Sequence, residues 1–212
     1  MIYELTTIDL KPRTLAPVEE AFAKLYAAMG IPPELMGFFH SEFGPLNQIV
    51  QIWKYADLAE RTRVTRRLEE GGRWPALLAE SLLSLRTEIL KPVWFSRELT
   101  LGQFGPYFEL RTYSYPPGTL QTIMKAWERA MPMRDALGSP VAVILETEIG
   151  VLNTLTHLWP YASLDERDTI RKEMSKKLWP PFKLDEAEGG PGYEILRQEN
   201  KLMMPAAFSP MQ

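Results

Sequence analysis

The chain has 212 residues, of which 45% are hydrophobic and 24% are charged, proportions that are ordinary for a globular protein. Its formal net charge of −3 gives no reason to expect a nucleic-acid partner, and the absence of cysteine excludes disulfides, thiolate nucleophiles and iron–sulfur ligation. No apolar run reaches the roughly 18 residues of a membrane-spanning helix, and the first residues resemble a strand rather than a leader. We therefore expect no membrane insertion and a cytoplasmic location.

The first third of the chain predicts a strand, a helix and a hairpin. Residues 2–10 predict a strand that ends at a proline turn. Residues 37–43 and 47–55, joined by a short glycine-containing turn, predict the two strands of a hairpin. Between the first strand and this hairpin lies a helix whose apolar residues recur at steps of four, three and four, namely Val18, Phe22, Leu25 and Met29.

A second helix and a last strand complete this pattern. The helix begins at Asp57, which forms a capping box with Glu60, and the strand covers residues 86–91. The whole order is β-α-β-β-α-β, and it occurs again further along the chain. The later strands are expected at 107–115, 141–149, 153–161 and 195–203, with a helix stripe at Leu120, Ile123, Trp127 and Met131, a capping box at Ser163 and Glu166, and a loop at 189–192.

The recurrence is also visible in the residues themselves. Three blocks repeat in the same order about 105 residues later: 3–7 aligns with 108–112, 42–47 with 148–153, and 53–61 with 159–167. Ordered matches at one spacing indicate an internal duplication. We predict two copies of one ferredoxin-like unit, at residues 1–104 and 105–212.

The same blocks carry a resemblance to a known family. The sequence resembles the NIPSNAP family through residues 3–5, 42–47 and 53–61, and in the second copy through 109–113 together with Asn153, His157, Trp159 and Tyr161. This family is similar in fold to the dimeric α+β barrels. The resemblance therefore implies an α+β protein whose tandem units form such a barrel as a pseudo-dimer, and it implies architecture more than activity. The sequence leaves open whether the barrel closes within one chain or between chains of a homo-oligomer.

Alternation along the strands gives each strand an apolar face and a mixed face. Val50, Ile52 and Leu158 lie on the apolar face, which we expect the helices to cover. The mixed face holds carboxylates, amides and large aromatic residues, so we expect it to line the interior of the barrel. Residues of this face that would bind a ligand are Arg111, Asn153, Trp159, Glu109, Tyr113, Asn47, Gln51, Trp53 and His40.

Most of these candidates also have a plain structural interpretation. Asn47 and Asn153 follow hairpin turns, where asparagine tolerates left-handed backbone, or they direct an amide into the barrel. Trp53 and Trp159 are either packing residues or a stacking wall for a flat ligand. Arg111 either pairs with a carboxylate, Glu109, Glu146 or Glu148, or anchors an anionic ligand.

His157 is the candidate catalytic residue, because imidazole can act as acid or base near neutral pH. Its repeat partner is Gln51, so the two copies differ here; the alternative is a structural histidine. His40 is a weaker candidate of the same kind. The carboxylates Glu42, Glu146 and Glu148 have no known metal-loop spacing, and we predict no metal site.

The leading functional hypothesis is a small, flat organic ligand bound in the barrel interior, with room for cofactor-independent oxygenase or isomerase chemistry. The alternative is a non-enzymatic interaction module whose barrel is only a structural core. The sequence has no dinucleotide-binding glycine pattern, phosphate loop, zinc-protease helix or nucleophile elbow, so we predict no cofactor. Haem with a histidine ligand is the less favoured exception.

Overall fold

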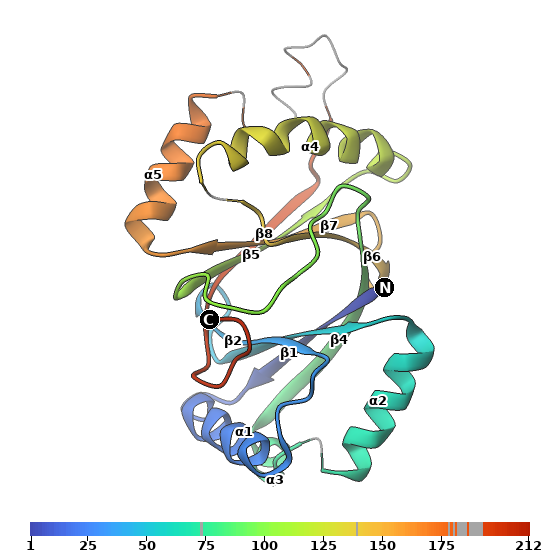
Figure 1. The fold of residues 1–212 in the computed structure, drawn as a ribbon, viewed down its shortest axis with the longest axis vertical. Helices are drawn as coiled ribbons and strands as arrows, with labels where there is room; N and C mark the ends of the chain where they lie inside the picture. The colour runs from blue at the N-terminus through green and yellow to red at the C-terminus, as the bar shows by residue number, and fades with distance from the viewer. Residues whose placement is uncertain (73, 139, 178, 180, 182–185, 187–192) are drawn as a thin grey trace.

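The computed structural model describes residues 1–72, 74–138, 140–177, 179, 181, 186 and 193–212. Its strands form one closed antiparallel barrel in the order β1-β3-β2-β8-β5-β7-β6-β4 (Figure 1). The predicted loop at 189–192 lies outside the described residues. The strands are β1 (Ile2–Leu10), β2 (Leu35–Phe43), β3 (Gln48–Tyr55), β4 (Leu82–Pro92), β5 (Tyr107–Ser114), β6 (Val143–Ile149), β7 (Thr154–Tyr161) and β8 (Arg197–Pro205).

The barrel consists of two ferredoxin-like sheets closed within a single chain. The first half has the strand order β4-β1-β3-β2 and the second half has β8-β5-β7-β6. Two seams join the halves: β2 pairs with β8 from Phe39 opposite Pro205, and β4 pairs with β6 from Ile89 opposite Ile149. The predicted tandem arrangement is confirmed, and the question of where the barrel closes is answered.

Helices cover the outside of the barrel, those of the first half on one side and those of the second half on the other (Figure 1). They are α1 (Leu15–Met29), α2 (Leu58–Glu70), α3 (Ala76–Ser81), α4 (Leu120–Asp135) and α5 (Leu164–Ser175). None of those described is long and apolar enough to cross a membrane, and the cytoplasmic location stays a prediction. The short helix α3 was not predicted, because six residues carry too little periodicity.

Local signals in the sequence explain several of the boundaries. The side chains of Asp57 and Ser163 accept hydrogen bonds from the backbone N–H groups of Glu60 and Glu166, at 2.8 and 3.0 Å. These are the two predicted capping boxes, and they start α2 and α5. Asn47 and Asn153 have φ angles of 54° and 59°, so each adopts the left-handed conformation that the turn interpretation requires.

The interior of the barrel is a packed apolar core. One buried cluster combines strand residues of both halves, including Val50 and Ile52 from β3 and Leu158 from β7. The space left among them has a volume of about 10 Å³. An eight-stranded barrel is only wide enough for its own side chains to fill, and here they do so.

This packing corrects the prediction about the two faces of the sheet. The helices do not cover the Val50 and Ile52 face; they cover the face with Trp53 and Tyr55 in the first half and Tyr113 in the second. The ligand pocket predicted for the barrel interior is therefore wrong in its location. Both faces of each sheet are covered, so alternation separates the two faces without showing which one lies inside.

A double-mutant cycle tests this assignment. We expect Leu158→Ala to lower the free energy of unfolding by about 2–5 kcal/mol and Ile52→Val by about 0.5–1.5 kcal/mol. Because the two residues line the same small interior space from different halves, the double variant should differ from their sum by about 0.5 kcal/mol or more. Urea denaturation measures all three.

The control cycle pairs Leu158→Ala with Val64→Ala. Val64 belongs to the cluster under the helices of the first half, so its effect should add to that of Leu158 within about 0.5 kcal/mol. Additivity of Ile52 with Leu158 would contradict the inward orientation of these strands.

Candidate functional site

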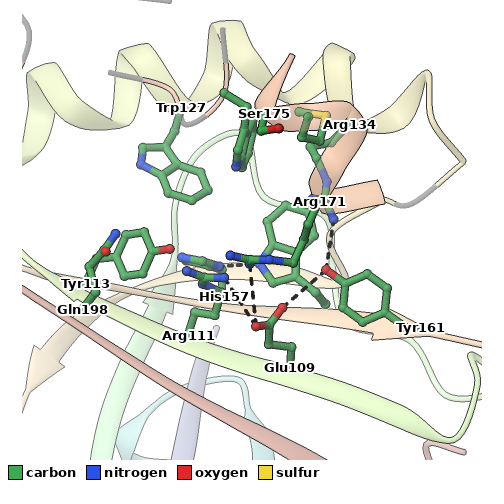
Figure 2. Close-up of a pocket in the computed structure, with 13 residues that line it drawn as sticks. Glu109, Arg111, Tyr113, Trp127, Arg134, His157, Tyr161, Arg171, Ser175 and Gln198 are labelled. Carbon is green, nitrogen blue, oxygen red and sulfur yellow. Dashed lines mark hydrogen bonds and ion pairs between the residues drawn. The ribbon is translucent and has the colours of Figure 1, made fainter. Parts of the chain in front are cut away.

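A cavity of about 310 Å³ lies between the sheet of the second half and helices α4 and α5 (Figure 2). The strands supply its floor. Glu109, Arg111 and Tyr113 occupy every second position along β5, so their side chains point to the same side of the sheet. On β7, His157 is the cross-strand partner of Arg111 and Trp159 is the partner of Glu109. Antiparallel pairing therefore brings the side chains of these neighbouring strands together.

The helices supply the roof of the cavity. Trp127 and Arg134 come from α4, Arg171 comes from α5, and Trp179 follows α5 in the chain. Figure 2 shows Arg171 reaching from its helix toward the sheet. The guanidinium of Arg134 lies 4.0 Å from the ring centre of Trp159, which is a cation–π contact, and it donates to the hydroxyl of Tyr161 at 3.3 Å.

Glu109 is the only carboxylate among the described lining residues, and it is buried. Arg167 donates to its Oε1 at 2.6 Å, whereas Arg111 and Arg171 lie at 3.4 and 3.9 Å from the same oxygen. Burial acts to raise the pKa of Glu109, but the hydrogen bond from Arg167 and the charges of all three arginines outweigh it, so the pKa is lowered. Glu109 is therefore an anion at neutral pH.

His157 is a neutral hydrogen-bond donor. Its Nδ1 accepts from the indole N–H of Trp159, which can only donate, so the ring carries its own hydrogen on Nε2. Within the described part of the chain, nothing accepts a hydrogen bond from Nε2. Burial, followed by the charges of Arg111 and Arg134, holds the pKa of His157 well below its usual range. The lone pair that a general base would need is already occupied.

The cavity collects five of the residues predicted from the sequence: Glu109, Arg111, Tyr113, His157 and Trp159. They meet under the helices instead of inside the barrel.

The other candidates lie elsewhere. Asn47 and Asn153 occupy hairpin turns, and His40 pairs with Glu19 of α1 at 2.9 Å. Gln51 and Trp53 lie in the first half, where the indole N–H donates to the amide oxygen at 3.0 Å.

Sequence reasoning missed the helical part of the site. Trp127 stood in the predicted stripe but was not selected, and Arg134 and Arg171 carried no motif. The alignment of the two copies held a usable signal, because Arg134 stands where the first copy has Met29, and Arg171 where it has Thr65.

Among its described residues, the first half keeps the same framework but fills the equivalent space. Arg61 binds Glu4 through two hydrogen bonds of 2.9 Å, which corresponds to Arg167 with Glu109. The space above this sheet is filled by an apolar cluster that includes Phe22, packed edge-on against Trp74 at 6.2 Å. A sheet-to-helix ion pair is thus common to both halves, whereas the cavity of about 310 Å³ between sheet and helices lies in the second.

The comparison with known proteins agrees with this repeat structure. The family model described as NIPSNAP matches twice, at residues 3–97 and 108–210. The chain belongs to the NIPSNAP family. Human protein NipSnap homolog 3B is 30% identical to this NIPSNAP chain, over 99% of the chain and 85% of the relative.

Two solved structures share the fold of this NIPSNAP protein over nearly their whole length. A putative monooxygenase from Fusobacterium nucleatum superposes with a TM-score of 0.69 at 10% identity, covering 100% of this chain and 97% of the other. A putative monooxygenase from Lactobacillus acidophilus gives a TM-score of 0.63 at 12% identity, with coverage of 97% and 94%. At this identity the likeness shows the fold alone.

The pH dependence of stability tests the state of His157, one of only two histidines in the chain. Below about pH 6.5, His157 binds a proton in the unfolded chain but not in the folded protein, because burial lowers the pKa of His157 in the fold. The free energy of unfolding should therefore fall with decreasing pH by up to about 1.4 kcal/mol per pH unit. His40 acts in the opposite direction, since its hydrogen bond to Glu19 raises its pKa.

We expect a His40→Gln protein to lose stability steadily between pH 6.5 and 5.5, as measured by urea denaturation. Adding His157→Gln, which installs the first-half residue, should flatten this slope. A flat profile in the His40→Gln protein alone would show that His157 titrates normally.

Proposed function

We propose that this protein binds a small, flat organic molecule in the cavity under α4 and α5. The observation that carries the proposal is the meeting of open volume with unsatisfied buried donors. Nε2 of His157 and Nε of Arg111 are both buried, and no acceptor for either exists among the described residues. A buried donor left without a partner costs about 1–3 kcal/mol, which a ligand oxygen could recover.

An unpartnered donor alone would be weak support. Nε2 of Gln51, at the position equivalent to His157 in the first half, also has no acceptor in the described structure. There, however, Trp53 and its neighbours form a packed apolar cluster. In the second half, the two residues that carry these donors line about 310 Å³ of space, which is at the lower end for small-molecule sites.

The aromatic walls favour a flat ligand. The ring of Trp179 stands nearly perpendicular to those of Trp127 and Trp159, at 5.6 and 6.1 Å between ring centres. Tyr113 closes the wall beside His157, at 4.9 Å. Planar molecules fit such surfaces through stacked or edge-on contacts.

Chemistry in this cavity stays a prediction. The two fold neighbours are named as putative monooxygenases, and an oxygenase or isomerase reaction here would use His157 as a donor that stabilises developing negative charge. The alternative, an interaction module with a structural barrel, is supported by the packed barrel interior. This alternative does not explain why buried donors without acceptors line the cavity.

Two fluorescent probes of the same shape test the binding proposal. N-phenyl-1-naphthylamine is neutral, and 8-anilino-1-naphthalenesulfonate adds one sulfonate. We expect at least one of them to bind saturably, with energy transfer from the tryptophans that line the cavity. Ser175→Trp should block binding, because Ser175 lines the cavity from an exposed position on α5.

The matched control is Glu69→Trp, which places the same ring at the equivalent exposed position of α2. It should leave binding unchanged. Failure of both probes to bind saturably, or equal binding by the wild-type and Ser175→Trp proteins, would end the proposal.

A further inference from the structure

We infer that the ligand carries an oxyanion, such as a carboxylate, on an aromatic or otherwise flat body, and that Arg111 and Arg171 hold this group beside His157. This inference rests on the proposed binding function. It adds the chemical class of the ligand, which neither the family nor the fold supplies.

The first reason is an excess of positive charge. Arg111 and Arg171 line the cavity with Glu109, whose shortest bond, at 2.6 Å, goes to a third arginine, Arg167. Arg111 donates a longer hydrogen bond of 3.4 Å to that carboxylate, and Arg171 forms an ion pair with it at 3.9 Å. Among the described lining residues, one anion thus faces several cations. Arginine keeps its charge in proteins, so the surplus persists at any physiological pH.

The second reason is the comparison of the two halves. In the first half, Glu4 and Arg61 pair through both carboxylate oxygens. The second half retains that pair as Glu109 and Arg167. It then has Arg111 in place of Thr6 and Arg171 in place of Thr65, with no second carboxylate among the described residues of its lining. The extra cations are not required by the framework, since the first half folds around the same pair without them.

The positive charges of the two added arginines also repel each other. Burial, followed by the charge of Arg111, lowers the pKa of Arg171. Grouping cations in a partly buried site is unfavourable unless an anion joins them, and guanidinium groups bind oxyanions through paired hydrogen bonds. An anionic ligand would relieve this repulsion.

The donors converge on one position. Arg111 and His157 are directly opposed on β5 and β7, so their side chains stand next to each other on the cavity floor. Figure 2 shows both, with Arg171 approaching from α5. An oxyanion there can accept from the guanidinium groups and from Nε2–H of His157, which supplies the missing acceptors.

The remaining walls define the body of the ligand. Trp127, Trp179 and Met174 add apolar surface to the lining of the cavity. Its 310 Å³ corresponds to about ten water molecules at liquid density. A flat body of two or three aromatic rings with a single anionic group fits this volume and a lining that combines arginines with aromatic side chains.

The same probe pair tests the inference through its charge. We expect the sulfonate probe to bind wild-type protein at least tenfold more tightly than the neutral naphthylamine. Arg111→Thr, which installs the first-half residue, should weaken the sulfonate probe by roughly 10- to 150-fold, because a charge-assisted hydrogen bond is lost. The affinity for the neutral probe should stay the same. Arg171→Thr provides a second variant, and thermal melting verifies that each variant is folded.

Two controls complete the experiment. Arg63→Thr removes the same charge from an exposed position on α2 and should leave both affinities unchanged. Competition with 2-naphthoate should displace the sulfonate probe, whereas the neutral 2-naphthamide should not, which separates a general oxyanion site from a preference for sulfonate.

Equal affinity for the charged and neutral probes, or full sulfonate binding by both arginine variants, would overturn the inference while leaving the binding function in place. Displacement by the amide as effectively as by the carboxylate would overturn it as well. Absence of saturable binding by either probe would overturn the binding function and this inference together.

Discussion

Closure of two sheets into one eight-stranded barrel determines where the polar side chains of those sheets can lie. The interior is only wide enough for the side chains that fill it, and about 10 Å³ remains there. A charge in that space would lose its water without gaining a partner. Carboxylates, guanidinium groups and the histidine of β5 and β7 therefore stand on the outer face. The cavity of the second half lies there, between sheet and helices.

The sheet-to-helix ion pair sets the geometry of that outer layer in both halves. Arg61 of α2 reaches Glu4 of β1, and Arg167 of α5 reaches Glu109 of β5. A buried carboxylate requires such a partner, so each pair ties its second helix to its first strand. With the framework held in this way, the side chains between the layers are free to fill the space or to leave it open. Fusion of the two units in one chain allows the halves to differ in this respect.

Much of the fold could be predicted because its signals are local. The repeat, the strand alternation and the capping residues Asp57 and Ser163 each depend on a few neighbouring positions. The choice of inner face could not be predicted in the same way. It depends on how wide the closed barrel is and on which layer each face meets, and both are properties of the assembled chain. Val50 and Trp53 are each buried in the structure, so hydrophobicity alone does not separate the inside of the barrel from the helix layer.

The candidate site shows the same division between local and assembled information. Arg111 and His157 could be grouped in advance because a period of two puts strand residues on one face. Arg171 could not, since its position depends on how α5 is rotated against the sheet. The duplication nevertheless contains information about it. Where the copies agree, as at Glu4 and Glu109, they form the framework. The copies differ at Arg111, His157 and Arg171, where the first half has threonine or glutamine. These three residues all line the cavity. A duplicated chain thus provides an internal comparison that separates residues shared for folding from residues that one half has to itself.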